Sequence, residues 1–93
     1  ADVVAVVLCD GLGHGPDAAR AAHVATRCFV AADPWPGPAR WLTDAHAAMR
    51  ATRGAAVGVA ELAGSSVRFA GVGNVAAAVV HAQGTRHLVS HNG

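Results

Sequence analysis

Residues 10–17 read DGLGHGPD and follow directly on the apolar run VVAVVLC of residues 3–9. The apolar run is typical of a β-strand, and the glycines break it. Pro16 and Asp17 suit the first turn of a helix, where proline needs no donor and a carboxylate meets the positive end of the helix. The stretch therefore predicts a strand that ends in the carboxylate of Asp10, a tight turn and a helix. Such a corner can hold a metal ion or a phosphate group.

The remaining pattern predicts a second helix and a series of short strands. The first helix is expected to run from Pro16 to about Ala31, because the proline-rich residues 33–38 cannot continue it. A second helix is expected over residues 39–52. Glycine-containing turns then separate expected strands over 55–62, 67–72, 75–82 and 85–89. The opening strand, residues 2–9, is expected at the centre of the sheet because it is apolar throughout.

The order of these elements indicates an α+β fold. Two helices are expected on one face of a largely antiparallel sheet, in a single domain of residues 1–93. The missing initiator methionine and the turn-like residues 91–93 predict that this is a partial domain, excised from a larger one. Because the helices cover only one face of the sheet, a further layer or a homodimer is expected to cover the other.

Composition limits the classes of function. The net charge is +1, and the seven basic residues, all arginine, are spread along the chain, so no nucleic-acid partner is expected. No apolar run approaches ~18 residues, so no membrane span is expected. Cys9 and Cys28 share no C-x-x-C motif, and reduced core cysteines of a cytoplasmic protein are expected. Their surroundings also lack the C-x₅-R loop of cysteine phosphatases.

The glycine-rich turn has four possible interpretations. A dinucleotide fingerprint requires G-x-G-x-x-G, and here the third glycine comes one residue early. A P-loop requires a lysine, which the chain lacks. A simple turn in which Asp10 caps the helix remains open. So does a metal site, since an aspartate at a strand end is a hard oxygen ligand suited to Mg²⁺ or Mn²⁺.

The first motif also resembles a known family. Residues 10–15, DGLGHG, followed by an alanine-rich helix, resemble the D-x-x-G-H-G motif of PPM-class metal-dependent serine/threonine phosphatases of the stage II sporulation protein E type. Residues 52–57 and 69–75 agree with further stretches of that family. Their spacing, with residues 89–93 at the end, resembles the RsbX-like branch, which acts on stress-signalling modules. The resemblance extends over the whole chain.

This resemblance implies a PPM-phosphatase-like antiparallel β-sheet packed with two helices, as part of an αββα sandwich. The implied activity is removal of phosphate from phosphoserine or phosphothreonine on a partner protein of bacterial stress or sporulation signalling. Two Mn²⁺ or Mg²⁺ ions would activate a water molecule and hold the phosphoryl oxygens. Asp10 would be the catalytic, bridging metal ligand and Gly11 would offer its backbone carbonyl. His14 would contact phosphate or a metal-bound water, or else serve only as a turn residue.

The chain also departs from the family pattern. Asn74 stands where relatives have an aspartate, and one carboxylate cannot hold two divalent cations. We therefore expect the isolated chain to bind metal weakly and to hydrolyse little. The alternative is a non-catalytic regulatory or binding module of the same fold. Trp35 and Trp41 are expected to pack in the core or anchor the linker, with a partner-binding patch as the alternative. If residues 75–82 and 85–89 pair as a hairpin, His81 and His87 could be cross-strand neighbours.

Overall fold

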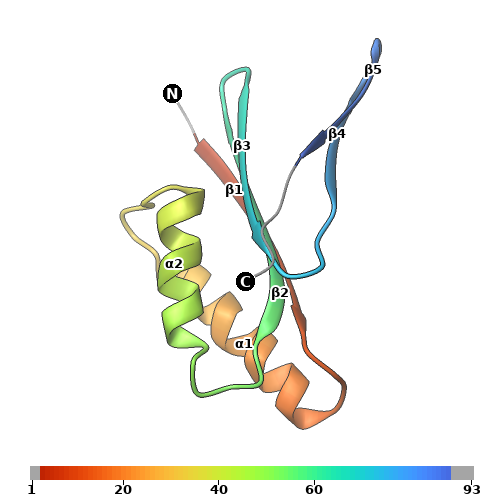
Figure 1. Cartoon of the computed structure of the whole chain (residues 1–93). Coiled ribbons are helices and arrows are strands. Elements are labelled where there is room, and N and C mark those ends of the chain that lie inside the picture. The colour runs from red at the N-terminus through yellow and green to blue at the C-terminus, as the bar shows by residue number, and fades with distance from the viewer. Residues whose placement is uncertain (1–2, 89–93) are drawn as a thin grey trace.

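The computed structural model describes residues 3–88, which form two helices and five strands (Figure 1). In chain order these are β1 (Val3–Gly11), α1 (Pro16–Val30), α2 (Pro38–Ala48), β2 (Ala55–Ala63), β3 (Ser66–Val72), β4 (Ala77–His81) and β5 (Gly84–Leu88). The expected elements are all found within this range. The expectations for residues 1–2 and 89–93 lie outside the described residues. The second helix is shorter than expected, because the chain turns after Ala48 and Thr52 accepts the backbone N–H of Gly54 at 3.0 Å.

The first three strands form one antiparallel sheet in the order β1–β2–β3. β1 is therefore an edge strand, and the expectation that it lies at the centre is wrong. Its apolar composition does not reflect burial on both faces. The side chains of Val6 and Leu8 are 55% and 74% exposed, whereas Val57 and Val59 on the central strand β2 are buried.

Both helices pack on one face of this sheet (Figure 1). α1 turns its alanines towards the strands, with Ala21 and Ala25 completely buried, and their small side chains let the helix lie close. From α2, Trp41 is 1% exposed and packs in the same cluster as Val57 and Val59. The described core is thus one layer between the helices and the sheet.

The two tryptophans belong to this core, as predicted. Phe29 lies edge-on to both Trp35 and Trp41, with ring centroids 5.5 Å apart in each pair. This aromatic cluster joins the end of α1, the proline-rich linker and α2. It explains how a linker with three prolines in residues 33–38 can hold a fixed path between two helices.

The last two strands form a separate two-stranded sheet. β4 and β5 lie on the side of the three-stranded sheet opposite the helices (Figure 1). The chain leaves β3 at Gly73, whose φ of +83° favours glycine, so the expected continuous meander does not form. In the hairpin register Ala78 pairs with His87 and His81 pairs with Gly84, so the predicted His81–His87 pair is also wrong.

The α+β class is confirmed: an antiparallel sheet is packed by two helices on one face. The more detailed assignment, a phosphatase-type αββα sandwich, is not supported. Within residues 3–88 the second sheet has two strands and no helix covers it. Neither α1 nor α2 has the length and hydropathy that a membrane-spanning helix needs.

Candidate functional site

The turn between β1 and α1 brings the strand end close to the first turn of the helix. Gly11 pairs with Ala55 at the end of the sheet, and the Leu12 N–H donates to the Gly54 carbonyl at 3.0 Å. Arg53 then joins the turn to the helix, because its guanidinium donates to Asp17 at 3.2 Å. The turn is thus held by the segment between α2 and β2.

Gly11 is required by packing. A Cβ atom at this position would lie 1.9 Å from the carbonyl oxygen of Ala18, far closer than atoms can approach. The backbone of α1 therefore passes directly over Gly11. This steric demand explains the glycine without any ligand on its carbonyl.

Asp10 points to the other face of the sheet. It is exposed and pairs with Ala56 across the strands. With Asn74 and neighbouring apolar residues it lines a cavity of about 170 Å³ beside the connection from β3 to β4. The structure thus brings Asp10 and Asn74 to one cavity, whereas His14 is exposed in the turn and does not line it.

The described donors do not fit two divalent cations. Among residues 3–88 no group of three or more histidine, cysteine, aspartate or glutamate side chains could hold a metal ion. Asp10, an amide from Asn74 and backbone carbonyls are oxygen donors, but they supply a single negative charge. Mg²⁺ and Mn²⁺ sites of the two-ion type need more carboxylates than this.

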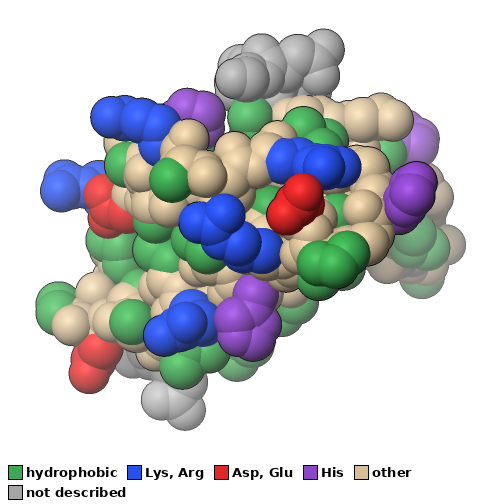
Figure 2. All heavy atoms as spheres, turned by 90° about the horizontal axis from the view of Figure 1, so that it is seen from below, with side chains coloured by type: hydrophobic (Ala, Val, Ile, Leu, Met, Phe, Trp, Pro, Cys, Tyr) green, Lys and Arg blue, Asp and Glu red, His purple; other side chains and the backbone are tan. Residues whose placement is uncertain are grey.

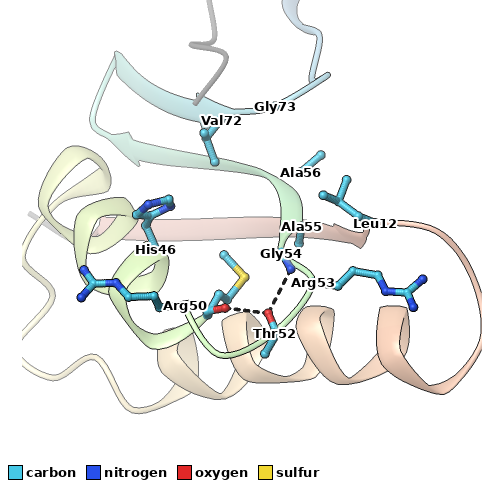
Figure 3. A pocket seen from close by; sticks show the side chains of 11 residues that line it. Leu12, His46, Arg50, Thr52, Arg53, Gly54, Ala55, Ala56, Val72 and Gly73 are labelled. Atoms are coloured by element: carbon cyan, nitrogen blue, oxygen red, sulfur yellow. Dashed lines mark hydrogen bonds between the residues drawn. The ribbon is translucent and has the colours of Figure 1, made fainter.

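A larger cleft lies on the helix side of the turn (Figure 3). It has a volume of about 340 Å³ and is bounded by the C-terminal end of α2, the β1–α1 turn and the ends of β2 and β3. We call it the α2 cleft; its lining residues are Leu12, His46, Met49, Arg50, Thr52, Arg53, Gly54, Ala55, Ala56, Val72 and Gly73. Local sequence patterns do not predict this cleft, because its residues come from three stretches that lie far apart in the chain.

A buried carboxylate was also missed. Glu61 on β2 is 5% exposed and accepts the indole N–H of Trp35 at 2.8 Å and the guanidinium of Arg68 on β3. The hydrogen bond from Arg68 and then that from Trp35 hold the pKa of the Glu61 carboxyl below its usual value. The hairpin register pairs Glu61 with Arg68, so the sequence did contain a signal for this contact.

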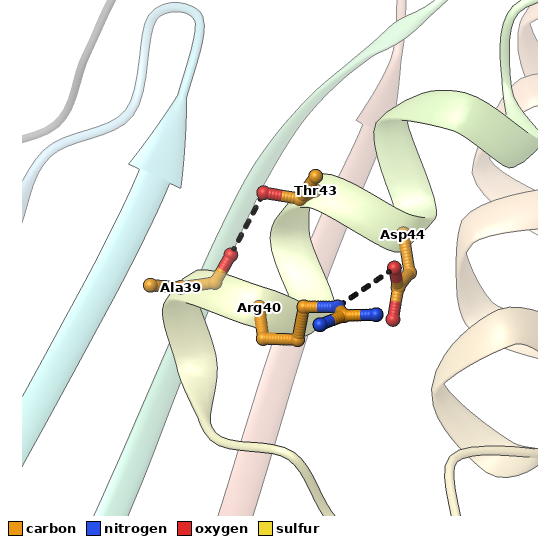
Figure 4. A network of polar contacts seen from close by, with 4 residues as sticks. All are labelled: Ala39, Arg40, Thr43 and Asp44. Carbon is orange, nitrogen blue, oxygen red and sulfur yellow. Dashed lines mark hydrogen bonds and ion pairs between the residues drawn. The ribbon is translucent and has the colours of Figure 1, made fainter.

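Other candidate groups are the two cysteines and the polar contacts on α2. Burial raises the pKa of the Cys9 and Cys28 thiols, and both cysteines are free, as expected for core thiols. On α2, Arg40 donates to Asp44 at 3.3 Å, one helical turn along (Figure 4). Thr43 donates to the carbonyl of Ala39 at 3.2 Å. Both contacts lie on the exposed surface of α2 and define no site.

Comparison with solved structures finds a similar structure from a signalling system. The chain is similar to a solved structure from the bacterial stressosome, a modular system that has been adapted to control secondary messenger signalling. The two share 29% sequence identity with a TM-score of 0.86, and the match covers 98% of this chain and 48% of that one. This chain therefore spans about half the length of the structure that it matches. No family model matches the chain, and the comparison with curated proteins finds no match.

This comparison corrects the expected identity. The assignment to PPM-class phosphatases of the sporulation protein E type, RsbX-like branch, is contradicted, because the match is to a system that controls signalling. The expected enzyme activity, a metal-dependent hydrolase acting on phosphoserine or phosphothreonine, is contradicted with it. The alternative, a non-catalytic regulatory module, agrees better with the finding. The roles expected of Asp10, Gly11 and His14 are not tested by it.

Proposed function

We propose that the chain is a non-catalytic regulatory module of a bacterial signalling assembly of the stressosome type, and that it acts by binding protein partners in the cytoplasm. The observation that carries this proposal is the structural match, which extends over nearly the whole chain at a TM-score of 0.86. An identity of 29% along that match adds sequence agreement to the agreement in fold.

The surface of the sheet supports a binding role. On the face away from the helices, Val4, Val6 and Leu8 of β1 are 57%, 55% and 74% exposed. Leu62 and Val67 on the neighbouring strands are 44% and 43% exposed. Contiguous exposed apolar side chains commonly mark an interaction surface. Such a surface agrees with a module that works within an assembly.

The proposal is tested by comparing binding with turnover. The purified chain is centrifuged with a reconstituted bacterial stressosome, and the same preparation is incubated with Mn²⁺ and a phosphoserine protein. We expect co-sedimentation and no release of phosphate above the rate of the Asp10→Asn variant. Turnover that this variant abolishes would overturn the proposal, and so would the absence of co-sedimentation.

A divalent cation at Asp10 stays a prediction. We propose that the Asp10 carboxylate holds at most one weakly bound Mn²⁺ or Mg²⁺ ion, because the described residues around it supply one carboxylate. Isothermal titration with Mn²⁺ should give weak binding that Asp10→Asn removes. Tight binding of two ions per chain would contradict this.

A further inference from the structure

The α2 cleft combines an apolar floor with open access from solvent. Figure 3 shows Leu12 on one side, Val72 and Ala56 above, and the loop from Thr52 to Gly54 below. Met49 is 5% exposed and forms part of the floor, whereas Leu12 is 52% exposed although it is a large apolar side chain. A volume of about 340 Å³ is at the lower end of the range for ligand sites, so the cleft suits one or two side chains rather than a large cofactor.

Two cationic side chains flank the cleft. Arg50 and Arg53 extend to opposite sides of it in Figure 3, and no aspartate or glutamate is among the lining residues. Arg53 is oriented by Asp17 but its side chain remains 44% exposed. Arg50 makes no ion pair with any residue between 3 and 88 for which a contact is described. At the end of the molecule seen in Figure 2, arginine and histidine side chains lie over an apolar surface, with a few acidic side chains among them.

We propose that the α2 cleft binds an acidic peptide segment of a protein partner. One apolar side chain of the segment lies on Leu12 and Met49, and carboxylates on either side of it contact Arg50 and Arg53. The charge complementarity selects an acidic segment, because the two guanidinium groups stand on both sides of an apolar floor. The cleft lies at the C-terminal end of α2, and the exposed apolar side chains of β1 are not among its lining residues, so this is a second surface. The inference rests on the proposed function only in taking the ligand to be part of a protein.

Hydrogen bonds hold the rim of the α2 cleft in place. Thr52 donates to the carbonyl of Met49 at 2.7 Å and accepts the N–H of Gly54 at 3.0 Å, which fixes the lower rim. The Leu12 N–H bond to Gly54 fixes the opposite wall. A preformed rim reduces the conformational entropy that a short peptide must lose on binding.

The test uses a fluorescein-labelled peptide, GDDLDDG, and the neutral counterpart GNNLNNG, with anisotropy as the measurement. We expect the acidic peptide to bind the whole chain and the neutral one to bind at least about tenfold more weakly. Arg50→Glu should weaken binding of the acidic peptide by a similar factor. For the parent chain, raising the salt concentration should also weaken binding, because salt screens the attraction between opposite charges. The matched control Arg86→Glu, on the distant strand β5, should leave the affinity unchanged.

A second pair of variants tests the apolar floor. Leu12→Ser should weaken binding about fivefold or more, because it removes an apolar wall of the cleft. Leu62→Ser, a leucine of similar exposure on the open sheet face, should not. The Tm of each of the four variants is compared with that of the parent chain, and a similar Tm indicates that the fold is retained. Amide shifts of Gly54 and Gly73 on peptide addition would locate the ligand in the cleft.

Three outcomes would overturn the inference. Equal binding of both peptides removes the role of charge. Complete competition by inorganic phosphate, together with no effect of Leu12→Ser, assigns the site to a small anion. An equal loss of affinity in Arg50→Glu and Arg86→Glu would mean that binding depends only on the net charge of the chain. Peptide binding without co-sedimentation with the stressosome would leave this inference standing and overturn the proposed function instead, so the two failures are distinguishable.

Discussion

Replacing Gly11 by alanine tests the packing of α1 on the sheet. The new Cβ would lie 1.9 Å from the Ala18 carbonyl oxygen, and real Cβ atoms essentially never approach within 3.0 Å. Since the Ala18 oxygen is a backbone atom and the new Cβ is fixed to the backbone of β1, neither can rotate away, and α1 must move from β1 by about 1 Å, which loosens the contacts of Ala21 and Ala25. Overpacking of this kind costs typically 1–3 kcal/mol, and we expect about 3 kcal/mol here. For a domain of this size that lowers Tm by roughly 12–24 °C.

Urea unfolding followed by circular dichroism and by tryptophan fluorescence measures this change. The control is Gly64→Ala, where no atom lies within 4 Å of the added Cβ but φ is +59°, so the expected cost is about 1–2 kcal/mol of backbone strain alone. Gly11 is not among the glycines with positive φ, so its penalty is purely steric. A loss below about 0.5 kcal/mol in Gly11→Ala would refute the close approach of helix and strand.

Three further predictions concern the core and the surface. Trp41→Ala should cost about 3–5 kcal/mol in the free energy of unfolding, measured in urea, because it empties the centre of the aromatic cluster; a loss under about 1 kcal/mol would contradict its central place. Because the pKa of the Glu61 carboxyl is lowered in the folded chain, the ionised carboxylate stabilises the fold. This contribution is complete above the ordinary pKa of about 4.5 and is lost as the pH falls through the lower pKa of the folded state. Stability should thus fall on acidification less steeply in Glu61→Gln, and an unchanged pH profile of Tm would exclude this contribution. Arg40→Ala should change stability by less than about 0.5 kcal/mol, since its pair with Asp44 is exposed; a larger loss in thermal unfolding would be inconsistent with a surface contact.

Local patterns in the sequence determined most of the secondary structure. Pro16 and the alanine-rich segment predicted α1, and the glycine-containing turns predicted the hairpins of β2–β3 and β4–β5. These features depend on backbone chemistry within a few residues, so they can be predicted without knowledge of the fold. The core role of Trp35 and Trp41 was also predictable, because large aromatic side chains beside a proline-rich linker need burial.

The placement of the strands depended on the tertiary structure. An apolar run such as that of β1 is compatible with a central strand or with an edge strand whose outer face is open, and only strand pairing decides between them. The same holds for the hairpin of β4 and β5, since Gly73 turns the chain away from β3. The exposed apolar face that follows from this arrangement could not be located from the sequence pattern.

The motif DGLGHG shows most clearly which features the sequence determines and which depend on the tertiary structure. By itself the sequence determined a strand, a turn and a helix, and it placed a carboxylate and a glycine next to each other at the strand end. Only the tertiary structure decided that Asp10 and Gly11 face opposite sides of the sheet, one towards a cavity with Asn74 and the other beneath α1. Likewise, the α2 cleft exists because three separate stretches of the chain meet in space. Residues in one motif act together only if the fold turns their side chains to the same place.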